Sequence, residues 1–246
     1  CRRVPPMKLA ALLALIAAAA LPARAAIIAA PVLYQHDGVK LEGWSAYDDS
    51  RSGPRPGILV VHQWKGLSAY EKKRAEMLAE LGYNVFCVDI YGQGIRPATP
   101  PAASAEAGKY KTNRPLLRAR AQAGLAVLRA NPHTDPRRLA AIGYCFGGTT
   151  VLELARSGAE IAGVVSFHGA LDSPTPADGQ NIKSRVLALH GADDSRLLAR
   201  HAGARGRLHH QHGFGGQQHQ GRTESVHLWH HQGRRHRVDQ SRGRRL

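Results

Sequence analysis

The clearest chemical feature of the chain is a cysteine flanked by glycines, in the run Gly143-Tyr144-Cys145-Phe146-Gly147-Gly148. An apolar, strand-like segment (residues 139–142) precedes this run, and a helical pattern follows it. A reactive residue on a sharp strand-to-helix turn needs small neighbours, because larger side chains would collide with the tightly turned backbone. At the start of a helix, the positive end of the helix dipole also favours a negatively charged sulfur. We therefore predict that Cys145 is a nucleophile, in preference to a buried cysteine beside a packing turn.

A thiolate that attacks a carbonyl group requires hydrogen-bond donors for the oxyanion that forms. In a strand–turn–helix site these donors are the backbone N–H after the nucleophile and a backbone N–H in the loop after an earlier strand. The corresponding residues are Phe146 and Trp64. The indole ring of Trp64 is also compatible with a place in the wall of an apolar pocket.

Four further side chains follow predicted strands and are candidates for the pocket: Gln63, His62, His168 and Tyr91. For the two histidines, a structural, hydrogen-bonded role is the first interpretation and a role in catalysis is the second.

A candidate acid follows the last predicted strand, in His190-Gly191-Ala192-Asp193-Asp194. It lies 49 residues after Cys145, which agrees with the chain order of nucleophile, acid and histidine in sites of this kind. We select Asp194 as the acid and interpret Asp193 as a turn residue. A solvated Asp-Asp turn is the alternative.

From residue 57 onward, strand and helix patterns alternate, which is typical of the α/β class with a mostly parallel sheet and helices on both faces. Ser68 and Glu71 have the spacing of a capping box at the start of one helix, and Gly82 follows its end. An antiparallel hairpin is predicted around Asp37-Gly38. The stretch 91–104, rich in Pro and Gly, is predicted to be a loop at the ligand-binding edge of the sheet. The predicted parallel strands are residues 57–62, 84–89, 139–142, 162–167 and 185–190.

Several motifs together resemble the dienelactone hydrolase family, within the α/β-hydrolase superfamily, over residues 26–194. The motifs are Val61-His62-Gln63-Trp64, Asp89-Ile90-Tyr91-Gly92, Ile142-Gly143-Tyr144-Cys145-Phe146-Gly147-Gly148, Val165-Ser166-Phe167-His168-Gly169 and His190-Gly191-Ala192-Asp193-Asp194. The resemblance implies a Cys-His-Asp triad that acts on small ester or lactone substrates without a metal or an organic cofactor. It assigns Cys145 as the nucleophile and Asp194 as the acid that orients the catalytic histidine.

The sequence departs from the family pattern at two positions. Dienelactone hydrolases carry a glutamate at the position of Gln63, and an amide cannot accept a proton in its place. The family histidine lies in a small-x-His-x-Phe motif about thirty residues after the acid. The nearest candidate is His227 in Ser225-Val226-His227-Leu228-Trp229, 33 residues beyond Asp194.

The N-terminal segment, residues 1–25, is predicted to contain an export signal. Lys8 precedes a 13-residue apolar run, and Ala23-Arg24-Ala25 has the form of a signal-peptidase site, with cleavage after Ala25. The signal thus covers about residues 7–25, and Cys1 precedes it. The apolar run is short for a membrane span, so we expect an exported, periplasmic protein without a membrane anchor. The remaining cysteines, Cys87 and Cys145, could pair in an oxidising periplasm, but a chain of this size does not need a single disulfide, so both are expected to be free thiols.

The formal net charge of +16 is concentrated at the C-terminal end. Residues 1–194 contain 23 Lys and Arg against 16 Asp and Glu, or +7, whereas residues 195–246 contain 11 Arg and 2 acids, or +9. The tail also holds nine of the 14 histidines and no sustained apolar period, so it is predicted to be disordered or the product of a reading-frame slip near codon 195. A normal last strand and helix are then missing.

Three functions remain open from the sequence. The first is an exported hydrolase of small esters or lactones that forms a thioester with Cys145. The second is a truncated or frameshifted family member that is catalytically impaired. The third is a binding protein that acts through its basic tail, although the charge distribution argues against specific recognition of nucleic acid.

Overall fold

The computed structural model describes residues 26–190 of the 246-residue chain. The predicted signal segment at residues 7–25, the acid pair Asp193 and Asp194, the candidate base His227, and the tail at residues 195–246 all lie outside the described residues.

The described residues form a seven-stranded sheet with the order β1-β2-β4-β3-β5-β6-β7. Strands β4, β3, β5, β6 and β7 are parallel, whereas β2 pairs antiparallel with both β1 and β4. This confirms the predicted mostly parallel sheet with an N-terminal hairpin. The strands are β1 (Ile27–His36), β2 (Val39–Asp48), β3 (Arg55–Val61), β4 (Asn84–Val88), β5 (Thr134–Tyr144), β6 (Gly163–Phe167) and β7 (Arg185–Leu189).

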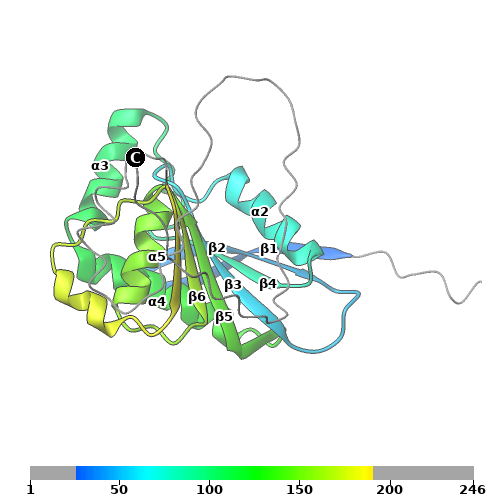
Figure 1. Ribbon diagram of the computed structural model, residues 1–246. Coiled ribbons are helices and arrows are strands. Elements are labelled where there is room, and N and C mark those ends of the chain that lie inside the picture. Colours follow the sequence, from blue (N-terminus) through cyan, green and yellow to red (C-terminus); the bar gives the residue numbers. More distant parts are fainter. Residues whose placement is uncertain (1–25, 191–246) are drawn as a thin grey trace, which may run out of the picture. The chain divides into compact units, whose positions relative to one another are not determined.

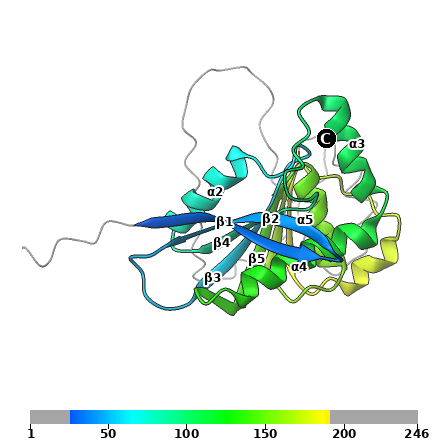
Figure 2. The same ribbon diagram turned by 180° about the vertical axis from the view of Figure 1, so that it is seen from behind.

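Helices cover both faces of the sheet, as Figures 1 and 2 show. Helix α2 packs on one face, and α4 and α5 pack on the other, with α3 against α4. The helices are α2 (Ala69–Glu80), α3 (Pro100–Lys111), α4 (Arg114–Ala130) and α5 (Phe146–Arg156), and a short 3₁₀ helix, η1 (Pro176–Asn181), precedes β7.

The central strands β3 and β4 supply core residues to both faces, because successive side chains of a strand point in opposite directions. In β3, Ile58 and Val60 belong to the cluster under α2, whereas Leu59 and Val61 belong to the cluster under α4 and α5. The same alternation in β4 places Cys87 in the smaller cluster. These strands read as continuous apolar runs because neither face meets water.

Two local predictions are confirmed in detail. The hairpin between β1 and β2 turns at Asp37 and Gly38, whose φ angles of 48° and 73° are those that a two-residue type I′ turn requires. At the start of α2, Ser68 accepts a hydrogen bond from the N–H of Tyr70, and Glu71 completes the capping box.

The predicted loop at residues 91–104 is wrong in its last five residues, because α3 begins at Pro100. Two prolines at the start of a helix do not weaken it, since the first N–H groups of a helix have no partner within the helix. Thr99 caps this end by accepting a hydrogen bond from the N–H of Ala102 at 3.4 Å. Strand β5 also begins at Thr134, five residues before its predicted start.

Candidate active site

The predicted site residues meet at one edge of the sheet. Strands β3, β4, β5 and β6 are parallel, so the residues that follow them lie at the same edge. These residues include His62 to Trp64 after β3, Tyr91 after β4, Cys145 after β5 and His168 after β6. Ring contacts join three of these segments, since Tyr91 lies 4.7 Å from His62 and 5.3 Å from Phe146 between ring centroids.

Cys145 occupies the sharp turn between β5 and α5, as its sequence predicts. Its backbone angles are φ 56° and ψ −115°, a combination that residues with a side chain rarely adopt. Its N–H donates to the carbonyl of Phe167 at 2.9 Å, and its carbonyl accepts from the N–H of Thr149 at 3.2 Å. The turn is therefore fixed on both sides, with a half-buried thiol at the N-terminus of α5.

The glycine at position 147 allows α5 to approach the end of β3. A Cβ atom there would meet the carbonyl oxygen of Val61 and would lie 2.8 Å from that of His62. The close approach places the first turn of α5 directly against the loop at residues 62–68, called here the 62–68 loop. As a result, the two predicted oxyanion donors, Phe146 and Trp64, come from backbone segments that touch.

Both predicted donor amides are unoccupied within residues 26–190. No carbonyl or side chain in this range accepts a hydrogen bond from the N–H of Trp64 or of Phe146. Phe146 is the first residue of α5, where an N–H has no partner within the helix. Fixed backbone amides that lack an acceptor in the described part of the chain are suited to an anionic oxygen.

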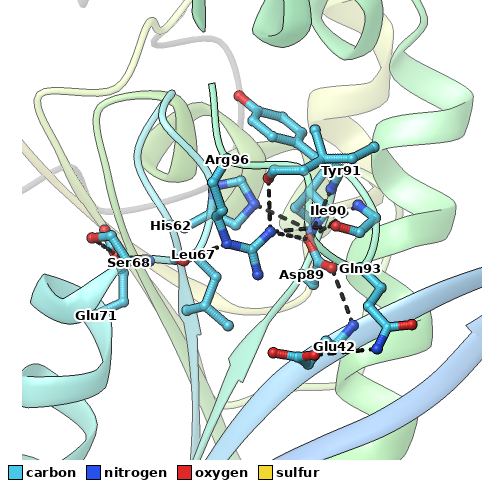
Figure 3. Close-up of polar contacts among 12 residues, drawn as sticks. Glu42, His62, Leu67, Ser68, Glu71, Asp89, Ile90, Tyr91, Gln93 and Arg96 are labelled. Carbon is cyan, nitrogen blue, oxygen red and sulfur yellow. Dashed lines mark hydrogen bonds and ion pairs between the residues drawn. The ribbon is translucent and has the colours of Figure 1, made fainter. Parts of the chain in front are cut away.

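Arg96 holds the 62–68 loop against the loop that follows β4. Its Nε donates to the carbonyl of Leu67 at 2.5 Å, and its Nη1 donates to the carbonyls of Gly92 and Ile95 at 3.3 and 2.7 Å. Asp89 lies 3.7 Å from the same Nη1 atom. Figure 3 shows the guanidinium group between Leu67 and Asp89, so one side chain joins the two loops.

Two other side chains fix the 62–68 loop. The buried carboxylate of Glu71 accepts from the N–H of Gln63 at 3.3 Å and from the N–H and hydroxyl of Ser68 at 2.9 and 2.6 Å. The hydroxyl of Tyr91 donates to the carbonyl of Trp64 at 3.0 Å. The capping box thus has a second role, because it also attaches the loop to α2.

Four aromatic rings pack beneath the predicted site: His62, Tyr91, Tyr110 and Phe146. Tyr91 stacks on Tyr110 at 5.3 Å, and Tyr110 donates a hydrogen bond to the carbonyl of Tyr91 at 3.0 Å. Burial raises the pKa of the Tyr91 phenol well above its ordinary value, so this hydroxyl acts as a donor and not as a base. The four rings thus form one connected aromatic cluster.

The two histidines near the site differ sharply. His62 is fully buried, with Nδ1 at 2.6 Å from the carbonyl of Gln63 and Nε2 accepting from the N–H of Ile90 at 3.2 Å. Both nitrogens are engaged, so His62 has the structural role that was the first interpretation. His168 is exposed, at a positive φ of 43°, and its N–H donates to Leu189 at 2.8 Å.

A second aromatic group surrounds Tyr144, the residue before Cys145, on the α2 side. Tyr144 stacks on Phe167 at 4.7 Å and meets Tyr70 edge-on at 5.3 Å, and the guanidinium of Arg74 lies over both tyrosine rings. Burial raises the pKa of Tyr144 to about 12.

The other described cysteine, Cys87, is a buried free thiol in the core, as predicted.

Sequence reasoning did not identify Arg96, Tyr110 or the second role of Glu71. A lone arginine in a Pro- and Gly-rich loop was the available signal for Arg96.

Within residues 26–190 there is no group of three or more His, Cys, Asp or Glu side chains that would hold a metal ion. No helix in that range is long and apolar enough to cross a bilayer.

The comparisons with known proteins agree with this geometry. A sequence profile described as the dienelactone hydrolase family matches residues 42–212. The solved structure of a protein named m3DLH is 34% identical and has a TM-score of 0.71, covering 78% of this chain and 82% of that protein. P91, a dienelactone hydrolase-like promiscuous phosphotriesterase from metagenomic libraries, is 35% identical with a TM-score of 0.70, covering 75% of this chain and 80% of P91.

A more distant match supports the fold alone. MGS-M1, an α/β hydrolase from a deep-sea metagenome library of the Medee basin, is 20% identical with a TM-score of 0.53, covering 75% of this chain and 80% of MGS-M1. The resemblance noted in the sequence is thus confirmed, and the chain belongs to the dienelactone hydrolase family of α/β hydrolases.

Proposed function

We propose that this chain hydrolyses small esters or lactones with Cys145 as the nucleophile. The observation that carries the proposal is the backbone of Cys145, with φ 56° and ψ −115° at the N-terminus of α5. This conformation holds a half-buried thiol on a fixed turn at the start of α5, and the amides of Phe146 and Trp64 have no acceptor within residues 26–190. A buried structural cysteine such as Cys87 has neither feature.

In the proposed reaction, the Cys145 thiolate forms a C–S bond to the carbonyl carbon, and the π electrons move to the carbonyl oxygen. The N–H groups of Phe146 and Trp64 stabilise that oxyanion. The tetrahedral species then collapses, the C–O bond to the alcohol breaks, and the leaving oxygen takes the proton that the thiol gave up. Water next attacks the thioester, which releases the carboxylic acid and restores the thiol.

A base is needed to take the proton from the thiol and later from water. His62 is unsuited to this role, because both of its ring nitrogens are engaged and the ring is fully buried. We retain His227 as the proposed base and Asp194 as the proposed acid that orients it, both outside residues 26–190. General-base assistance contributes about 10²–10⁴-fold, so a chain without an effective histidine would acylate and then deacylate slowly.

The test measures p-nitrophenyl acetate hydrolysis by the full-length wild type, Cys145→Ala and Cys87→Ala. We expect a rapid release of p-nitrophenol and an acetyl group on Cys145, located by peptide mass spectrometry, in the wild type and in Cys87→Ala. Cys145→Ala should show neither. Equal rates for wild type and Cys145→Ala would remove Cys145 from the mechanism. A rapid first turnover without further turnover would favour the catalytically impaired alternative.

A second substrate class is proposed from the likeness to P91, which is described as a promiscuous phosphotriesterase and is 35% identical. In this reaction the Cys145 sulfur would bond to phosphorus, and the aryloxide would leave with its bonding electrons and take up the proton that the thiol gave up. Water would then attack phosphorus, break the P–S bond and restore the thiol. Release of p-nitrophenol from diethyl p-nitrophenyl phosphate, lost in Cys145→Ala, would support it. The absence of release from an enzyme that cleaves p-nitrophenyl acetate would restrict the substrates to carbon esters.

We also propose that the protein is exported, from the signal pattern at residues 7–25. Cell fractionation with N-terminal sequencing tests this, and a mature N-terminus at Ala26 is expected.

Retention on DNA that weakens with salt would favour the alternative of a binding protein with a basic tail.

A further inference from the structure

We propose that His62 is a positioning residue for ester cleavage: its Nδ1–H holds the Gln63–Trp64 peptide so that the Trp64 N–H faces the oxygen of the carbonyl under attack. This inference rests on the proposed function and adds to it the side chain that orients an oxyanion donor.

The argument begins with one peptide unit. The carbonyl of Gln63 and the N–H of Trp64 belong to the same planar, trans peptide, so they point in opposite directions. The Gln63 oxygen lies 2.6 Å from Nδ1 of His62 and also accepts from the N–H of Gly66 at 3.2 Å. Holding that oxygen fixes the direction of the Trp64 N–H. A hydrogen bond to the carbonyl also polarises the peptide, which strengthens its N–H as a donor.

The ring contacts fix which nitrogen carries the proton. A carbonyl oxygen only accepts, so Nδ1 must donate to Gln63. The N–H of Ile90 donates to Nε2 at 3.2 Å, so Nε2 must be unprotonated. The ring is fully buried, and burial lowers the pKa of His62, which agrees with a neutral ring of one tautomer.

Packing fixes the orientation of the same ring. His62 stacks on Phe146 with ring centroids 5.7 Å apart and an interplanar angle of 18°, and it meets Tyr91 edge-on at 4.7 Å. The buried His62 ring therefore contacts both predicted donor residues: it packs against Phe146 and holds the peptide that carries the N–H of Trp64.

The other side chains that fix the 62–68 loop bind different peptide units. Tyr91 donates to the carbonyl of Trp64, Arg96 donates to that of Leu67, and Glu71 accepts from the N–H of Gln63. Within residues 26–190, His62 is the side chain that donates to the Gln63 carbonyl. Its effect on the Trp64 amide is thus separable from theirs.

The experiment compares two reactions of Cys145 in the full-length protein. Acylation by p-nitrophenyl acetate develops an oxyanion, whereas alkylation by iodoacetamide occurs at a saturated carbon and develops none. Both rates are measured at Cys145 by peptide mass spectrometry for the wild type, His62→Asn and His62→Gln. Asparagine places an N–H donor near the position of Nδ1, whereas glutamine reaches the position of Nε2 and leaves the Gln63 carbonyl without that donor.

We expect His62→Gln to lower the maximal acylation rate by about tenfold or more, with the alkylation rate within about twofold of wild type. His62→Asn should recover most of the acylation rate. Equal acylation by wild type and His62→Gln, or a parallel fall of both reactions in His62→Gln, would overturn the inference. If wild-type Cys145 is alkylated but never acylated, the proposed function itself fails, which is a distinguishable result.

A second measurement needs no variant. Nitrogen NMR of the His62 ring in the wild-type protein should show a neutral ring with the proton on Nδ1 and slow exchange of that proton with water. A proton on Nε2 would overturn the inference, since Nδ1 would then have no hydrogen to donate to Gln63.

Discussion

Replacement of Cys145 by glycine and by alanine separates the strain of the turn from its chemistry. Cys145 has φ 56° and ψ −115°, a conformation that glycine adopts readily and other residues do not. A non-glycine residue in such a region stores about 1–3 kcal/mol of strain. Glycine also makes the unfolded chain more flexible, which costs about 0.5–1 kcal/mol relative to alanine. The difference predicts that Cys145→Gly is more stable than Cys145→Ala, by up to about 2.5 kcal/mol.

The assay is urea unfolding of the full-length variants, followed by fluorescence and circular dichroism. Cys87 provides the matched control, because it is a buried cysteine in the interior of β4. At that ordinary strand position, Cys87→Gly should be less stable than Cys87→Ala by about 1 kcal/mol. Opposite signs at the two cysteines would identify strain at the turn and exclude a general effect of glycine.

The reasoning is refuted if Cys145→Gly is less stable than Cys145→Ala by an amount similar to that at Cys87. Such a result would mean that the turn holds its conformation without stored strain. Neither variant at position 145 retains the thiol, so the stability comparison does not depend on activity.

Three further predictions concern the supports of the site. Arg96→Met removes hydrogen bonds to three carbonyls from a side chain that is 29% exposed, so we expect the free energy of unfolding in urea to fall by about 1–3 kcal/mol and the acylation of Cys145 to slow. The control Arg137→Met, at a side chain that is 89% exposed, should change neither quantity. Glu153 is fully buried and pairs with Arg118 and Arg156 at 2.7 Å. In Glu153→Leu, Arg118 keeps its ion pair with Asp178, but the buried Arg156 loses its carboxylate partner, which should cost about 3–5 kcal/mol by urea unfolding; an unchanged midpoint would contradict this. Burial lowers the pKa of His62 below its ordinary 6.5, so the unfolded chain takes up a proton at a higher pH than the folded chain does. The free energy of unfolding should therefore decline below pH 6.5 by up to about 1.4 kcal/mol per pH unit, and His62→Asn should lack this part of the decline.

The elements that hold Cys145 were predictable because their signals are local. The capping box at Ser68 and Glu71 and the turn at Asp37 and Gly38 each depend on residues within three positions of one another. The turn at Cys145 likewise requires only an apolar strand, a glycine on either side and a helix. Helix α3 was missed because its prolines and small residues carry almost no amphipathic pattern, although the protein tolerates prolines at its first turn.

The sequence by itself thus determined the class of fold, the sharp turn that carries Cys145 and the order of the segments along one edge of the sheet. Only the tertiary structure decided that Arg96 joins two loops, that Glu71 holds Gln63, and that both ring nitrogens of His62 contact backbone groups. The physical reason is distance along the chain. The N–H of Ile90, which contacts the ring of His62, lies 28 residues away, and the carbonyl that Arg96 binds in Leu67 lies 29 residues away. Such contacts form only when β3 and β4 pair, so no pattern within either segment indicates them.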